Sequence, residues 1–242
     1  MMDKGIGFSR TVLLDWLDVC ASLCQENLET AEIRNRLAVT IADTVHGKDA
    51  QRKTIDVLTA IWLKTAKTAP QLHRQALDLF PTLSSRVERT WLHYGMTLVC
   101  YPIFRKCSVS IGQISRIDDS ITRKTIKERI AAEVGHLGAL DRSVERILAS
   151  LTNWGMLAAS DQKHIWNIQL HSFSSPSAKL QTWLLACALH AHPADSLPFN
   201  DLIHLPELYP FRISVGVDQL RQDSNFEIQL QGGDLTMVKV NS

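Results

Sequence analysis

The stretch KERIAAEVGHLGALDRSVERILASLTNWGML, residues 127–157, decides how the middle of the chain folds. Apolar residues recur every four positions up to Val134, and again at intervals of three and four from Val144 to Leu151. Both spacings place the apolar residues on one face of an α-helix. The stretch therefore predicts two amphipathic helices in succession.

Glycines and a carboxylate mark the ends of these two helices. Gly135 and Gly138 bracket a short turn at residues 136–137, and Asp141 is of a residue type that caps helix N-termini. Gly155 follows the last apolar position, and glycine readily takes the left-handed conformation that ends a helix. We expect a tight helix–turn–helix that stops at Gly155.

The flanks of this pair predict a small β-sheet. Residues 120–121 form a short candidate strand, and Thr122 is a natural N-cap for the first helix. Beyond the second helix, residues 156–159 and 165–170 are candidate strands joined by a polar turn at residues 160–163. The predicted order is strand, helix, helix and two-stranded hairpin.

The first hundred residues predict one helix after another, with neither a strand pattern nor a repeat. Ser9 and Asp49 are the expected N-caps of two of these helices. Ser84 or Ser85 opens a long helix, which the Tyr-Pro pair at residues 101–102 breaks. A further helix is expected over residues 104–117. This part of the chain is predicted to be a helical bundle.

The last third of the chain is predicted to have mixed structure. A serine-rich linker at residues 173–178 precedes a helix at 183–190 and an irregular, proline-containing stretch at 194–211. Two strands follow at 226–230 and 235–240, hinged on Gly232-Gly233. The fold class is therefore mainly α, with a small mixed α/β C-terminal part. We expect three regions, at residues 1–107, 108–173 and 174–242.

Composition is that of an ordinary globular protein. Of 242 residues, 45% are hydrophobic and 21% charged. The apolar runs are too short to cross a membrane, and we expect no secretion signal. The five cysteines show no C-x-x-C pair, which favours free thiols in a reducing cytoplasm. We expect a cytoplasmic protein without a membrane partner.

Charge is distributed unevenly along the chain. The net charge is only +1, but residues 1–107 carry 14 basic against 11 acidic side chains. Residues 108–163 carry 8 against 7, and residues 164–242 carry 4 against 7. Attraction to phosphate is therefore expected from the first two-thirds of the chain, and repulsion from the last third.

Three segments carry a resemblance to a known superfamily: SITRKTIKERIAAEVG, ALDRSVERILASLTNWGML and AASDQKHIWNIQL. With the residues before them, they resemble a winged helix-turn-helix domain over about residues 108–171. The resemblance implies that the second helix of the pair enters the major groove of double-stranded DNA. It also implies three sets of contact residues: Arg142, Ser143 and Arg146 at base edges, Arg123, Lys124 and Lys127 at phosphates, and Lys163 and His164 at the wing tip.

The same helices support a second hypothesis. Asp141 and Glu145 place carboxylates on the face that would meet phosphates, and many winged helices act as protein–protein adaptors. In that case Arg142 and Glu145 would form ion pairs with another subunit of a complex.

The overall layout, a helical half ahead of a late winged helix, is also similar to accessory proteins of bacterial phage-defence loci of the BREX type.

No motif nominates an enzyme, a cofactor or a metal. Glycine-rich phosphate loops and metalloprotease or hydrolase signatures are absent from the sequence. Cys20 and Cys24 stand one helical turn apart, but without a second pair they are expected to be buried thiols and not half of a metal site. His190 and His192 are expected at a helix end.

An aromatic run precedes the winged-helix region, namely Trp91, Tyr94, Tyr101 and Phe104. Aromatic side chains with basic neighbours are suited to stacking on nucleotides. Their helical spacing favours a core stripe instead, one that packs against the winged-helix region and fixes it to the bundle.

Overall fold

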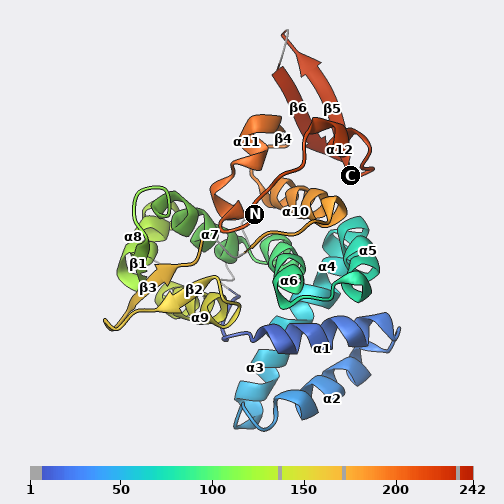
Figure 1. Cartoon of the computed structure of the whole chain (residues 1–242). Coiled ribbons are helices and arrows are strands. Elements are labelled where there is room, and N and C mark those ends of the chain that lie inside the picture. The colour runs from blue at the N-terminus through green and yellow to red at the C-terminus, as the bar shows by residue number, and fades with distance from the viewer. Residues whose placement is uncertain (1–6, 136–137, 171–172, 233–234, 242) are drawn as a thin grey trace.

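The structure is a computed structural model that describes residues 7–135, 138–170, 173–232 and 235–241 (Figure 1). It is mainly α-helical, as the sequence predicts. The N-terminal part consists of the helices α1 Leu14–Gln25, α2 Thr30–Ile41, α3 Lys48–Thr59, α4 Thr65–Thr68, α5 Pro70–Leu79, α6 Arg86–Cys100 and α7 Pro102–Ile114. A π-helical turn, Ala60–Lys64, joins α3 to α4, and a 3-10 turn, Phe80–Thr82, follows α5.

The middle of the chain contains a strand, two helices and a hairpin, in the order predicted: β1 Ser120–Thr122, α8 Arg123–Val134, α9 Leu140–Asn153, β2 Leu157–Ala159 and β3 Ile165–Ile168. The three strands form an antiparallel sheet in the order β1-β3-β2. Ile121 lies opposite Trp166, and Ala158 lies opposite Asn167. Gly155 has φ +81°, so it takes the left-handed conformation expected after α9.

The C-terminal part is mixed, as expected, and is built from α10 Ala178–Ala191, β4 Ser196–Pro198, α11 Phe199–Ile203, a 3-10 turn at Pro206–Leu208, α12 Val217–Arg221, β5 Phe226–Gln231 and β6 Leu235–Val240. A second antiparallel sheet has the order β4-β6-β5. The β5–β6 hairpin projects away from the helices (Figure 1). Residues 194–211, predicted to be irregular, instead include β4 and α11.

Two of the predicted helix caps are confirmed and three are wrong. The hydroxyls of Ser85 and Thr122 accept hydrogen bonds from backbone amides three residues on. Ser9 is not a cap, because α1 begins only at Leu14. Asp49 and Asp141 are not caps either, because α3 and α9 begin one residue before them, at Lys48 and Leu140. The predicted turn at residues 136–137 and the Gly233 half of the predicted hinge lie outside the described residues.

One cluster of buried side chains runs through all three parts of the chain. Phe104 of α7 contacts Tyr94 of α6 and Trp154 at the end of α9, with ring centroids 5.2 and 5.8 Å apart. Tyr94 in turn lies 4.9 Å from Phe211 of the C-terminal part. The aromatic run is therefore core, as predicted, and it joins the middle region to the bundle.

The turn at Pro206–Leu208 fixes α7 from the other side. A side-chain carbon on Gly112 of α7 would overlap the carbonyl oxygen of Pro206, so only glycine permits this close approach. Arg105 of α7 pairs with the buried carboxylate of Glu207 at 2.6 Å, and the Tyr94 hydroxyl donates to the Glu207 carbonyl at 2.6 Å. The helix that leads into the middle region is thus held by a segment almost a hundred residues further along the chain.

The C-terminal end of α9 is bound to the residues that open α1. The amide of Val12 donates to the Ser150 hydroxyl at 2.8 Å, and the Trp154 indole donates to the Val12 carbonyl at 3.0 Å. The amide of Leu14 donates to the Asn153 side chain at 2.9 Å. These bonds anchor the C-terminal end of α9, and in its N-terminal half Asp141, Arg142, Glu145 and Arg146 are the residues that are not buried.

Candidate nucleic-acid interface

The candidate site consists of α8, the N-terminal half of α9 and the turn between β2 and β3. α8 packs on α9 and on α7, with Ile126, Ile130 and Ala131 buried. α9 buries Val144, Ile147, Leu148 and Leu151, the stripe that the sequence predicts. These contacts fix which side chains of the two helices remain near solvent.

Arg142 and Lys163 lie where the DNA hypothesis needs them. Arg142, in the first turn of α9, is exposed and makes no ion pair with any described residue. Lys163 and His164 are exposed in the turn that joins β2 to β3, and His164 has φ +66°. This turn is closed by a hydrogen bond from the Ser160 amide to the Ile165 carbonyl at 3.1 Å.

Ser143 is a correction to the predicted contact set. Its side chain is only 2% exposed, so its hydroxyl does not face the surface that would meet a base edge. The physical reason is its position, since Ser143 stands four residues before Ile147 and therefore on the apolar face of α9. It packs into the core with that face.

Arg146 is only partly available. Arg146 is half-buried, and its Nε atom is buried without a hydrogen-bond partner among the described residues. A buried guanidinium nitrogen without a partner costs free energy. Arg142 is therefore the better-placed arginine of α9 for a contact outside the molecule.

The predicted phosphate-contacting residues of α8 are engaged with the carboxylates of α9. Arg123 lies 3.2 Å from Glu145 and 3.9 Å from Asp141, and Lys127 lies 3.5 Å from Asp141. The four side chains are between 29% and 47% exposed, so solvent screens these pairs. Lys124 differs, because its side chain is 81% exposed and its nearest carboxylate, on Glu128, is 3.9 Å away.

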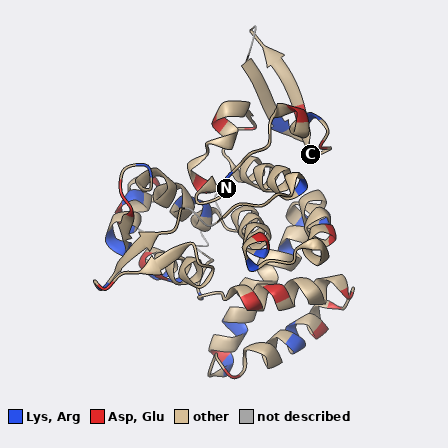
Figure 2. Cartoon of the chain, in the orientation of Figure 1, with Lys and Arg blue, Asp and Glu red and all other residues tan. Residues whose placement is uncertain are grey.

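The ion pairs with α8 partly neutralise the acidic residues of α9. Asp141 and Glu145 do not present bare negative charge, since each lies beside a cation from α8. The sequence contains the signal for this pairing, two cations on one helix and two carboxylates on the next, but not the register that joins them. In the described part of the chain, Lys and Arg lie interspersed with Asp and Glu over many of the helices (Figure 2).

The other residues considered from the sequence give no further candidate site among the described residues. Cys20 is buried, as expected, whereas Cys24 is partly exposed. The His192 ring accepts from the Ala194 amide at 3.1 Å just past the end of α10, as expected of a histidine at a helix end. No group of three or more His, Cys, Asp or Glu side chains suited to a metal occurs in the part of the chain that the structure describes. None of the described helices is long and apolar enough to cross a membrane.

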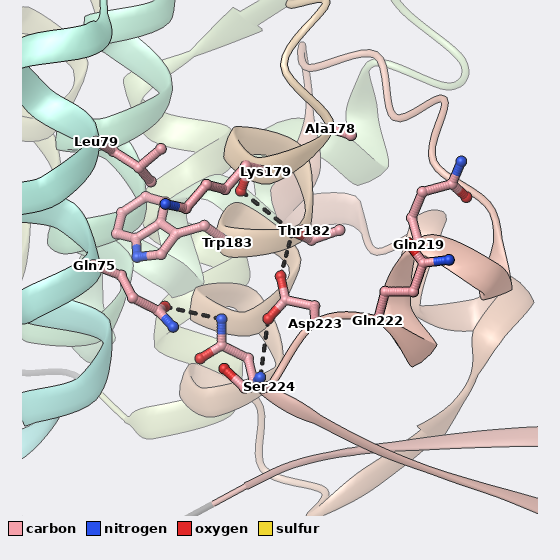
Figure 3. Close-up of a pocket in the computed structure, with 11 residues that line it drawn as sticks. Gln75, Leu79, Ala178, Lys179, Thr182, Trp183, Gln219, Gln222, Asp223 and Ser224 are labelled. Carbon is pink, nitrogen blue, oxygen red and sulfur yellow. Dashed lines mark hydrogen bonds between the residues drawn. The ribbon is translucent and has the colours of Figure 1, made fainter.

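An open cavity of about 350 Å³ lies between α5, α10 and the segment after α12 (Figure 3). Its polar side chains largely satisfy one another. The Thr182 hydroxyl donates to Asp223 at 2.5 Å, and the Asn225 amide donates to Gln75 at 2.9 Å. These bonds attach the C-terminal segment to the bundle, which gives the lining a structural role.

No family model, curated protein or solved structure matches this chain.

Proposed function

We propose that this chain is a non-catalytic, cytoplasmic protein that binds double-stranded DNA, with residues 108–173 acting as a winged helix-turn-helix module. The observation that supports the proposal most is the arrangement of α7, β1, α8, α9, β2 and β3, with sheet order β1-β3-β2 and with Arg142 exposed in the first turn of α9. A helix held in this way is suited to the major groove, and the β2–β3 turn to the adjacent backbone.

In this proposal Arg142 is the residue that reads bases. Its guanidinium is exposed and unpaired among the described residues, and arginine pairs bidentately with guanine. Lys124 of α8 and Lys163 with His164 of the wing contact phosphates. Such contacts position the protein without selecting a sequence.

Arg123 and Lys127 contribute in a second way. Their partial exposure leaves them within reach of a phosphate, which competes with the carboxylates of Glu145 and Asp141 for the same cations. An exposed ion pair is worth only about 0.2–1 kcal/mol, so this exchange costs little. The pairs therefore reduce repulsion of DNA while the protein is free.

The test is fluorescence anisotropy of labelled mixed-sequence duplex DNA, titrated with the full chain at two salt concentrations. Binding should weaken steeply as salt rises, because phosphate contacts release counterions. Lys124→Ala should weaken binding to every duplex and reduce the salt slope by about one. Arg142→Ala should cost about 1–3 kcal/mol on a selected site and reduce sequence preference.

Lys53→Ala is the matched control, since Lys53 is a half-exposed cation paired with Asp49 on α3, away from the module. It should leave DNA binding unchanged. If the wild-type protein does not bind duplex DNA at low salt, or if all three variants behave alike, the proposal fails.

A second proposal is a protein-interaction subunit. The observation that favours it is apolar exposure outside the candidate interface: Ile117 is 82% exposed, and Leu230 and Leu235 of the projecting hairpin are 66% and 47% exposed. Such residues mark partner surfaces where they gather. Absence of DNA binding together with capture of a specific protein subunit, lost on Leu230→Asp, would favour this reading. A role in bacterial phage defence stays a prediction from the resemblance.

A further inference from the structure

The two edges of the sheet β4-β6-β5 differ in how they are protected. β4 is a short strand that ends in Pro198 and is followed directly by α11, which packs on it. β5 is longer, contains no proline and carries a single charged side chain, that of Glu227. No described strand lies beyond it. Short strands, prolines and charges keep sheet edges from pairing with other chains, so the edge at β5 is the open one.

The hydrogen bonds of the hairpin show which backbone groups of β5 face this open edge. Asn225 and Asn241 continue the register of β5 and β6, and the Asn241 amide donates to the Asn225 carbonyl at 2.8 Å. Backbone groups alternate from side to side along a strand, so those of residues 225, 227, 229 and 231 point towards β6. Those of residues 226, 228 and 230 point away from it.

Two of the three outward-facing residues have free backbone groups. The amide of Phe226 donates to the Asp223 carbonyl at 3.1 Å, which closes the edge at the base of the hairpin. Ile228 and Leu230 have no such bond to a described residue on the open side. Figure 1 shows α12 beside the base of the hairpin and the outer part of β5 clear of the helices. The amides and carbonyls of both residues are thus presented to an incoming strand.

The side chains of the same two residues extend the core outwards. Ile228 lies opposite the fully buried Val238 of β6 and is itself half-buried, whereas Leu230 is further out and exposed. Opposite residues of antiparallel strands share a face, and so do residues two apart on one strand. The apolar face of the sheet therefore runs from the core to an uncovered end at Leu230.

We propose that β5 pairs antiparallel with β5 of a second copy of this chain, around a two-fold axis at Gln229. Ile228 then lies opposite Leu230 of the partner subunit, and each free amide and carbonyl of these residues gains a hydrogen bond. The two sheets become one, in the order β4-β6-β5-β5-β6-β4. This inference goes beyond the proposed DNA binding and does not depend on it.

A second copy fits this edge because the pattern of β5 is complementary to itself. In the two-fold register the apolar residues Ile228 and Leu230 meet one another, Gln229 meets its own counterpart, and Glu227 meets an uncharged glutamine, Gln231 of the partner subunit. Apolar pairs therefore form on one face, and no like charges stand opposite on the other. A shift by one residue would set the apolar side chains opposite polar ones.

The ends of the strand disfavour a shift by two residues. In one direction Leu230 would face Phe226, whose amide is already bonded to Asp223. In the other direction Ile228 would face Gly232, whose φ of +54° takes it out of the extended conformation. The register centred on Gln229 uses every free backbone group of the edge.

Sedimentation velocity of the full chain over a series of protein concentrations tests the dimer. The weight-average mass should rise towards twice that of one chain as the concentration increases. Leu230→Pro should remain monomeric, because it removes an outward amide and keeps the bonds that the residues on either side make to β6. Leu235→Thr is the matched control, since it removes an exposed leucine from the central strand β6 and leaves the edge intact. It should dimerise like the wild type.

A pair of cysteine variants tests the register and does not depend on folding of the proline variant. Gln229→Cys places two thiols opposite each other in a non-hydrogen-bonded pair, where Cα atoms lie about 4.5 Å apart, within the range for a disulfide. Mild oxidation should give a covalent dimer. Gln231→Cys, also exposed on the same face, is the control, because its own counterpart lies on the order of 13 Å away along the strand. It should cross-link no faster than the wild type.

Two results would overturn the proposal. One is a monomer at every concentration, which would leave the open edge to a strand of a different protein. The other is equal cross-linking of the Gln229→Cys and Gln231→Cys variants, which would show that the chains meet by random collision and not through β5 in this register. Neither measurement contains DNA, so failure here is distinct from failure of the proposed DNA binding.

Discussion

Ser150 shows how much of this structure rests on single hydroxyls. Its side chain accepts from the Val12 amide and donates to the Arg146 carbonyl one turn earlier. Ser150→Ala would leave a buried amide of Val12 without a partner, which costs about 1–3 kcal/mol of unfolding free energy. Urea denaturation followed by circular dichroism measures this loss.

Thr152→Ala is the control for Ser150, because among the described residues the Thr152 hydroxyl bonds only to the Leu148 carbonyl of its own helix. It should cost clearly less. Equal losses in the two variants would show that the bond to Val12 is energetically unimportant.

Residue-scale features could be predicted where their cause is local. Thr122 and Ser85 bond to amides three residues away, and a short stretch of sequence contains both partners. Leu14 is different, since the group that accepts from its amide belongs to Asn153. No pattern around α1 reveals a partner 139 residues away, so the local sequence points to Ser9 instead.

At the scale of elements, the pairing of α8 with α9 carries a prediction about DNA. Glu145→Gln removes the carboxylate that holds Arg123 at 3.2 Å without changing side-chain size. Arg123 then keeps only the longer contact with Asp141 at 3.9 Å and is more available to a phosphate, so DNA affinity should rise and the salt slope should steepen by at most about 0.9. Anisotropy titration at several salt concentrations measures both quantities.

Asp218→Asn on α12 provides the matched control, because it makes the same charge change and breaks an exposed ion pair, that with Arg221 at 3.0 Å, outside the module. It should leave the slope unaltered. If both variants raise affinity alike, net charge and not the α8–α9 pairing governs binding.

Most elements could be predicted because the apolar residues of each helix repeat along its own sequence. The same argument places Arg142 at the surface and Ser143 in the core, whereas the exposure of Lys163 follows from its place in the polar turn between β2 and β3. The contact of Arg123 with Glu145 could not be predicted, because it depends on how two helices are rotated against one another.

For the whole molecule, the pKa values of three histidines predict how the free energy of unfolding depends on pH. Burial lowers the pKa of His93, His190 and His192, and for His93 it outweighs the raising effect of its contact with Asp18. Below pH about 6.5 the unfolded chain binds protons at these residues more readily than the folded chain does. The free energy of unfolding should therefore decrease as the pH is lowered through that range.

Urea midpoints at pH 7.5 and 5.5 test this dependence, and the midpoint should be lower at pH 5.5. His93→Gln should reduce the difference between the two midpoints, even though it lowers stability at both pH values. A midpoint independent of pH, or an unchanged difference in the variant, would contradict the assignment of the effect to buried neutral histidine.

The bonds between the start of α1 and the end of α9 have a consequence for synthesis of the chain. Ribosomes make residues 1–107 first, yet the amides of Val12 and Leu14 find their acceptors only after Ser150 and Asn153 have been added. Until then these two amides have no native acceptor. The N-terminal bundle of a growing chain is therefore incomplete until more than half of the protein has been translated, and its folding is tied to that of the region that follows it.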